Sequence, residues 1–141
     1  MPRAARSLSL ADAKTIIEAG ERKAVELKRA YNIAVVDCGG NLLAHARMDG
    51  AWVGSVDIAI NKAWTAWAFD MSTENLGLMA QDGKPGFGIN TTNHSRVVIF
   101  GGGIPVLLDG DVIGAVGASG STVDEDILVA RAAIEGFSGR C

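Results

Sequence analysis

Two very short turns limit how the strands of this chain can be connected. The first is Asp37-Cys38-Gly39-Gly40-Asn41, between the apolar or alternating segments 33–36 and 42–47. The second is Asp109-Gly110-Asp111, between the apolar segments 104–108 and 112–118. Glycine in such turns adopts the positive φ values that a tight hairpin needs. A parallel crossover takes about a dozen residues or more, so both pairs of strands must be antiparallel.

Helical patterns surround these hairpins. Ser9 and Asp12 form a capping-box pattern, with aspartate in place of the usual glutamate, before apolar residues at helical spacing over 10–29. Thr122 and Glu125 form a similar pattern near the end of the chain. The other predicted elements are a helix over 55–70 capped by Ser55, a short helix over 72–79, a strand over 97–100 and a last helix over 122–137.

The predicted order of elements is α-β-β-α-(α)-β-β-β-α. It favours an α+β fold with a five-stranded, mainly antiparallel sheet flanked by helices, of the profilin-like or PAS-like kind. A chain of 141 residues is long enough to bury one sizeable core. No repeat or low-complexity linker divides it, so we expect an N-terminal arm over 1–8 and a single domain over 9–141.

Charge and cysteine content exclude several classes of partner. The formal net charge is −3 and no run of Lys or Arg is present, so nucleic acid is not expected as a partner. No apolar stretch approaches the length of about 20 residues that spans a bilayer, and the first residues do not resemble a secretory signal. Cys38 and Cys141 lie far apart without further metal ligands. We therefore expect two reduced thiols, no zinc site and a cytoplasmic protein.

The predicted helix over 55–70 is apolar nearly all round. A helix that covers one face of a sheet needs only one apolar stripe, so the surplus favours contact with a second subunit. Burial beneath the chain's own loops is the alternative. On this basis we expect a homo-oligomer.

Lys62 stands among the apolar residues of this helix. An ammonium group is costly to bury without a partner, so either a carboxylate or a ligand must neutralise it. Asp49, Asp57 or a neighbouring chain could supply the carboxylate. Alternatively, Lys62 could bind a propionate or another anionic group. Asp124, Glu125 and Asp126 open the last predicted helix, and we interpret them as acidic residues favoured by the helix dipole.

Two histidines and one arginine are further candidates. Arg47 ends the second predicted strand, where its guanidinium could hold a ligand carboxylate or pair with Asp49. His45 shares its face of the strand, and we interpret it as a satisfied polar residue rather than a metal ligand. His94 lies in a polar loop, where it could bind haem iron, act as an acid or base, or simply be solvated.

Glycines and hydroxyls mark two places where backbone could approach a ligand. The first is the run of Gly101, Gly102 and Gly103. The second is Ser119, Gly120 and Ser121, which lead into the last helix and could offer N–H groups to a carboxylate or phosphate. Helix capping is the alternative for the second group. Gly114 and Gly117 lie within a predicted strand and are interpreted as close-packing positions.

Four motifs, spread over almost the whole chain, resemble those of the GlcG/HbpS-like family, also called the haem-degrading domain family. They are RMDGA (47–51), IAINKA (58–63), FGGGIP (100–105) and GAVGASG (114–120). The resemblance extends to the C-terminal domain of the PduO-type corrinoid adenosyltransferases. It implies the same α+β fold and homo-oligomers, and it makes haem the leading named ligand.

Three hypotheses of function follow. The first is a protein that binds a small, largely apolar ligand with an anionic group, with His94 as the haem-iron ligand and Lys62 and Arg47 facing the propionates. The second is a cofactor-independent isomerase or lyase in small-molecule catabolism, in which Lys62 polarises a carbonyl and His94 moves a proton. The third is a non-catalytic oligomeric accessory protein.

Overall fold

The structure of the protein is a computed structural model that describes residues 1–138, so Cys141 lies outside the described residues. The elements in this range are α1 (Leu10–Glu26), β1 (Asn32–Val36), β2 (Leu42–Arg47), α2 (Gly54–Phe69), α3 (Thr73–Met79), the 3₁₀ turns η1 (Ile89–Thr91) and η2 (Asn93–Ser95), β3 (Gly103–Leu108), β4 (Asp111–Ser119) and α4 (Val123–Ser138).

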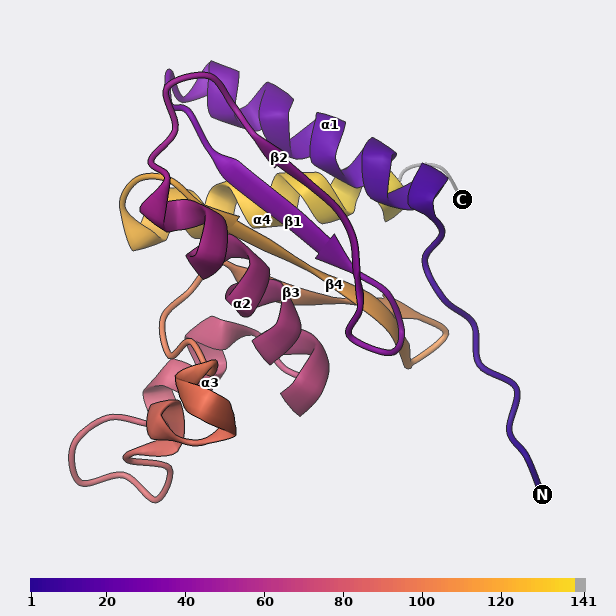
Figure 1. The fold of residues 1–141 in the computed structure, drawn as a ribbon, viewed down its shortest axis with the longest axis vertical. Helices are drawn as coiled ribbons and strands as arrows, with labels where there is room; N and C mark the ends of the chain where they lie inside the picture. Colours follow the sequence, from indigo (N-terminus) through magenta and orange to yellow (C-terminus); the bar gives the residue numbers. More distant parts are fainter. Residues whose placement is uncertain (139–141) are drawn as a thin grey trace.

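The strands form one sheet in the order β2-β1-β4-β3, and every neighbouring pair is antiparallel. Helices α1 and α4 pack together on one face, and α2 lies across the other (Figure 1). The central strands β1 and β4 are therefore covered on both sides, which explains why they read as nearly continuous apolar runs. The α+β class and the antiparallel sheet predicted from the sequence are confirmed.

The predicted number of five strands is wrong, because the sheet has four. Residues 97–103, which we call the 97–103 segment, cross α2 before they enter β3. The Val98 N–H donates to Thr65 Oγ1 of α2 at 3.1 Å, and residues 97–102 belong to no strand. Pairing with β4 begins only at the end of the segment, where the Gly102 carbonyl accepts from the Ala118 N–H at 2.9 Å. Although Phe100 keeps 43% of its surface exposed, the apolar run over 97–100 buries Val97. Its hydrogen bonds go to a helix side chain, however, and local sequence does not indicate that partner.

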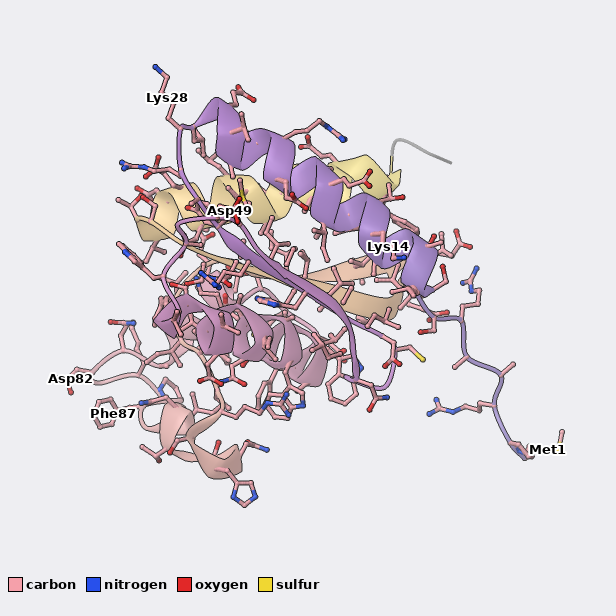
Figure 2. The ribbon with its side chains drawn as sticks, turned by 45° about the horizontal axis from the view of Figure 1, so that its top comes forward. Met1, Lys14, Lys28, Asp49, Asp82 and Phe87 are labelled. Carbon is pink, nitrogen blue, oxygen red and sulfur yellow. The ribbon has the colours of Figure 1, made fainter. Side chains whose placement is uncertain are left out.

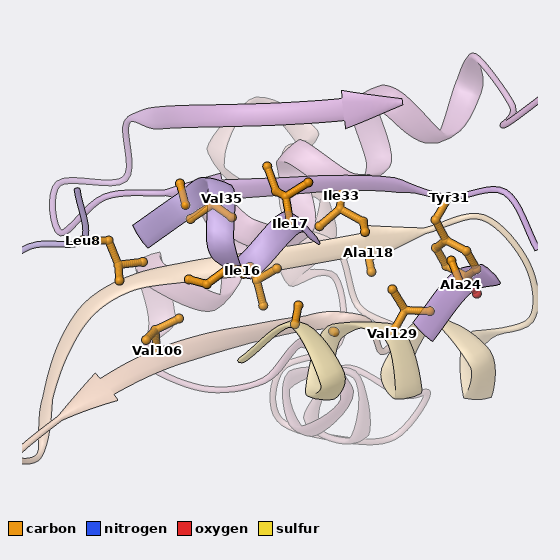
Figure 3. Close-up of a cluster of buried hydrophobic side chains, with 14 of the residues drawn as sticks. Leu8, Ile16, Ile17, Ala24, Tyr31, Ile33, Val35, Val106, Ala118 and Val129 are labelled. Atoms are coloured by element: carbon orange, nitrogen blue, oxygen red, sulfur yellow. The ribbon is translucent and has the colours of Figure 1, made fainter. Parts of the chain in front are cut away.

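Two hydrophobic clusters hold the layers together. The larger one lies between the sheet and the pair α1 and α4, where Ile16, Ile33, Ala118 and Val129 are fully buried (Figure 3). The smaller one lies beneath α2, where three alanines pack on the central strands. These alanines are Ala59, Ala63 and Ala66. Small side chains on one helical stripe let α2 lie close to the sheet.

Helix ends and turns follow the sequence signals with one exception. Ser9 and Asp12 form a complete capping box, with both reciprocal hydrogen bonds present. Asp109 and Gly110 both have positive φ, as a two-residue type I′ hairpin turn requires. The expected cap of α2 is wrong, because the helix begins at Gly54 without a side-chain cap, and Ser55 is buried inside its first turn.

The N-terminal residues are exposed up to Ser7, and burial begins at Leu8. Its side chain is buried in the larger cluster, and its N–H donates to the Ile113 carbonyl at 2.9 Å. Residues 1–7 are exposed, and Met1 lies away from the sheet and helices (Figure 2).

The outward side of α2 carries aromatic rings. Trp64, Trp67 and Phe69 are partly exposed there, and Trp64 contacts both of the other rings.

Among residues 1–138, no helix is long and apolar enough to cross a membrane. Self-association through α2 stays a prediction, for which light scattering is the direct measurement.

Gly117 tests how tightly α2 must pack. A Cβ at this position would overlap the Ala59 carbonyl and lie 2.7 Å from the Ala63 nitrogen, both in the backbone of α2. We expect Gly117→Ala to lower the free energy of unfolding by about 1–3 kcal/mol or more, measured by urea denaturation. Gly54→Ala is the control, because nothing lies within 4 Å of its added Cβ. Equal stability of the two variants would contradict the close contact.

Candidate functional site

Lys62, on α2, has a fully buried side chain. Its Nζ donates to Asp126 Oδ2 at 2.8 Å and to the Ala118 carbonyl at 2.9 Å. Asp126 lies in the first turn of α4 and is itself buried. The expectation of Asp49 or Asp57 as the partner is wrong: Asp49 lies beyond the end of β2 (Figure 2), and Asp57 accepts a hydrogen bond from Asn61.

Asp126 also accepts hydrogen bonds from N–H groups for which the sequence left both a ligand and helix capping open. Its Oδ1 accepts hydrogen bonds from the backbone N–H groups of Gly120 and Ser121, each at 3.2 Å. Ser119 is buried beside them at the end of β4. The anion at this helix N-terminus is therefore a carboxylate of the chain itself. Asp126 is more than a residue favoured by the helix dipole, because it joins Lys62 to the turn before α4.

The 97–103 segment covers this buried pair. Gly102 has φ of +123°, and a Cβ there would lie 2.6 Å from both Lys62 Nζ and the Ala118 carbonyl oxygen. The ring centroid of Phe100 is 5.1 Å from the same Nζ, close enough for a cation–π contact. Burial lowers the pKa of Lys62, and the neighbouring Asp126 partly offsets that effect.

Gly101 and Gly103 bring the same segment against its neighbours. A Cβ on Gly101 would lie 2.6 Å from the Ile127 side chain, and one on Gly103 would overlap the Lys62 carbonyl. The three glycines thus allow close packing of the segment on α2 and α4. The structure gathers Lys62, Gly102 and residues 119–121 around Asp126, inside the protein.

A different group of candidates lies on β2, on the face of the sheet that also carries α2. Register places His45 opposite Ala34 and Arg47 opposite Asn32. His45 Nε2 is 3.0 Å from Asn32 Oδ1, and Asn32 Nδ2 donates to the Trp52 carbonyl at 2.9 Å. Asn32 is fully buried, so both ends of its amide are held in place.

These bonds determine which nitrogen of His45 carries its proton. The amide nitrogen of Asn32 must face the Trp52 carbonyl, so the oxygen faces His45, and Nε2 must be the protonated donor. The other nitrogen, Nδ1, then holds a free lone pair. His45 is partly exposed, and within residues 1–138 its ring makes a side-chain hydrogen bond through Nε2 only.

Charge and burial keep His45 neutral. Burial lowers the pKa of His45 from its ordinary value of 6.5, and the positive charge of Arg47 lowers it further. Arg47 is exposed and uses Nη1 to donate to the Ala51 carbonyl at 3.2 Å. Trp52 follows directly, with 64% of its surface exposed. We call Asn32, His45, Arg47 and Trp52 the β2 site.

Sequence reasoning placed His45 and Arg47 on one face but missed the role of Asn32. A polar residue between Tyr31 and Ile33, at the start of an apolar strand, was the available signal. Its meaning depends on the register of β1 and β2, which brings Asn32 to His45.

His94 lies far along the chain, in η2, and its side chain is exposed. Asn93, His94 and Ser95 all have positive φ, between 52° and 59°. This region borders an open cavity of about 380 Å³ between α2 and residues 90–100. Phe100 lines that cavity and also covers Lys62. The structure therefore separates His94 from Lys62, the first exposed on a loop and the second enclosed beneath a ring.

A protein-family model described as "Haem degrading protein HbpS-like" matches residues 8–135. A 15.0 kDa protein from the dhaT–dhaS intergenic region of Citrobacter freundii is 47% identical over 132 residues, with 94% of this chain and 93% of that protein covered. The corrinoid adenosyltransferase PduO of the same organism is 33% identical over 136 residues. That match covers 96% of this chain but 41% of PduO, so the chain spans less than half of that enzyme.

Solved structures share the fold. The crystal structure of Klebsiella pneumoniae ORFY has a TM-score of 0.95 at 43% identity, covering 97% of this chain and 94% of that one. A crystal structure of a PduOC–haem complex has a TM-score of 0.89 at 33% identity, covering 92% and 94%. A crystal structure of HbpS has a TM-score of 0.85 at 27% identity, covering 95% and 92%.

The buried pair makes a direct prediction for stability. Removing one charge of such a pair leaves the other unpaired, so Lys62→Met should cost about 3–5 kcal/mol of unfolding free energy, measured by urea denaturation. The control Lys23→Met breaks the surface pair with Glu26 and should cost about 1 kcal/mol or less. Adding Asp126→Leu to Lys62→Met should recover part of the loss. A loss for Lys62→Met no larger than for Lys23→Met would overturn the prediction.

Proposed function

Because this chain belongs to the family of HbpS-like haem-degrading proteins, we propose that it binds haem, or another flat and largely apolar ligand with an anionic group, at the β2 site. The observation that carries the proposal is the state of His45. It is a neutral, partly exposed imidazole whose Nε2 is held by Asn32 and whose Nδ1 holds a free lone pair.

This arrangement fits a haem-iron ligand. Metal-binding histidines usually donate their second ring N–H to a fixed oxygen, which holds the ring and raises the basicity of the ligating nitrogen. Asn32 Oδ1 has that role here. Haem, when bound, supplies an iron centre that accepts the nitrogen lone pair. His45 is therefore preferred over His94, whose ring has no such hydrogen bond within the described chain.

The remaining residues of the β2 site suit the rest of the ligand. Arg47 has further N–H groups beyond the one that binds the Ala51 carbonyl, and these would hold a propionate. The exposed indole of Trp52 offers an apolar surface for the edge of a flat ring. Lys62 is assigned a structural role in this proposal, because Asp126 already neutralises its charge.

Hemin titration of the purified apoprotein, followed by absorption spectroscopy, tests the proposal. We expect a saturable change of the Soret band that is lost in His45→Ala and retained in His94→Ala. Arg47→Gln should weaken binding without removing the spectral change, because it alters the contact with the propionate and not the iron. Loss in His94→Ala with retention in His45→Ala would move the site to the polar loop and reject the β2 site.

Asn32 has its own prediction. Asn32→Asp should still accept the Nε2 proton, whereas Asn32→Leu should leave the imidazole free to turn and to change tautomer. We expect Asn32→Leu to weaken hemin binding about 10- to 100-fold and Asn32→Asp to weaken it less. The comparison requires that both variants keep the far-ultraviolet circular dichroism of the native protein. Equal binding by all three proteins would exclude a positioning role for Asn32.

The lowered pKa of His45 predicts how the free energy of unfolding depends on pH. The unfolded chain binds a proton on this residue more tightly than the folded one, so protonation favours unfolding. Stability should therefore fall as the pH drops from about 6.5 through the lowered pKa of the folded protein. His45→Gln should remove this part of the slope in urea denaturation between about pH 5 and pH 7. An unchanged slope in the variant would show that His45 is not held neutral.

A further inference from the structure

An open cavity lies apart from the β2 site, on the opposite side of α2. It has a volume of about 380 Å³, within the range of small-molecule sites. Its apolar lining includes Ile58, Val98 and Phe100. Its polar lining includes Asp57, Asn61 and Arg96. The buried Lys62–Asp126 pair lies behind Phe100, so that ring closes the inner side of the cavity.

Arg96 is held in place yet keeps donors free. Its guanidinium lies 4.6 Å from the ring centroid of Trp64, and its Nε donates to Asn61 Oδ1 at 3.1 Å. Nowhere in residues 1–138 does a carboxylate lie within ion-pair distance of it. Stacking and the Nε hydrogen bond fix the planar group, and the terminal N–H groups are left to bind an anion.

Asp57 places a negative charge on the other side of the same amide. Asn61 Nδ2 donates to Asp57 Oδ2 at 3.1 Å, while its Oδ1 accepts from Arg96. The cation and the carboxylate are therefore spaced by one amide group without neutralising each other directly. A ligand that carries an acid and a hydrogen-bond donor on adjacent atoms matches this spacing.

The loop beside the cavity is built with strain. Asn93, His94 and Ser95 are three consecutive non-glycine residues in the left-handed region, each at a cost of about 1–2 kcal/mol. Hydrogen bonds of Thr92 to the Ile89 carbonyl and to the Asn93 side chain hold the turn. Ser95, the last of the three, lines the cavity together with Arg96, which follows it. Such strain concentrates at binding sites.

We propose that this cavity binds a small carboxylic acid with an apolar side chain and an adjacent amino or hydroxyl group. Arg96 binds the carboxylate, Asp57 accepts the hydrogen bond from the amino or hydroxyl group, and the apolar lining holds the side chain. This ligand site is independent of the proposed haem function and shares no residue with the β2 site.

A matched set of aromatic probes tests each contact. L-Phenylalanine, L-3-phenyllactate, 3-phenylpropionate and phenethylamine share one apolar group and differ in the acid and donor groups. Binding can be followed by isothermal titration calorimetry and by the fluorescence of Trp64, with Trp64→Phe identifying its signal. We expect L-phenylalanine and L-3-phenyllactate to bind at least about tenfold more tightly than the other two probes. The reason is that 3-phenylpropionate lacks the donor group for Asp57 and phenethylamine lacks the carboxylate for Arg96.

Variants assign the contacts to residues. Arg96→Gln should weaken L-phenylalanine and L-3-phenyllactate about 10- to 100-fold, and Asp57→Asn should remove their advantage over 3-phenylpropionate. Arg22→Gln, on α1, is the matched control and should change nothing. Equal binding of all four probes, no binding of any, or no effect of Arg96→Gln would overturn the proposal. Hemin binding by Arg96→Gln should match that of the native protein. A failure of the proposed cavity site can therefore be distinguished from a failure of the proposed haem site.

Discussion

The buried ion pair between Lys62 and Asp126 joins the helices on opposite faces of the sheet. It connects the middle of α2 to the first turn of α4, and Lys62 also binds the Ala118 carbonyl of β4. Asp126 binds the two N–H groups that follow β4. Burying two charges is expensive, and the hydrogen bonds around both groups are what make it tolerable. The helices on opposite faces of the sheet are thereby fixed relative to one another.

This pair also explains the positions of the glycines. The 97–103 segment passes directly over the ammonium, and Gly102 has no room for a side chain there. Gly117 of β4 also has no room for a side chain, because a Cβ there would overlap the backbone of α2. These glycines are thus packing residues around a buried charge. The run of Gly101, Gly102 and Gly103 serves here to bring a crossing segment close to α2 and α4.

Both proposed ligand sites lie where this tight packing ends. Helix α2 packs mainly on β4, β1 and β3, and it leaves the edge strand β2 with its polar side chains half open. His45 and Arg47 are accessible there, while buried Asn32 fixes the imidazole from below. On its other side α2 borders the cavity with Arg96. The two sites therefore use opposite sides of one helix, and α2 is the shared wall between them.

The sequence by itself determined the local elements of this protein. The type I′ turn at Asp109 and Gly110, the capping box of Ser9, the antiparallel hairpins and the family motifs all depend on residues close to one another, where backbone sterics and short hydrogen bonds decide the outcome. It also identified Lys62 as a charge that needed a partner. Tertiary structure alone decided that the partner was Asp126, that residues 97–100 pack on a helix rather than a sheet edge, and that Asn32 holds His45. Each of these depends on contacts between residues far apart in the chain, and local sequence patterns do not specify which distant residues meet.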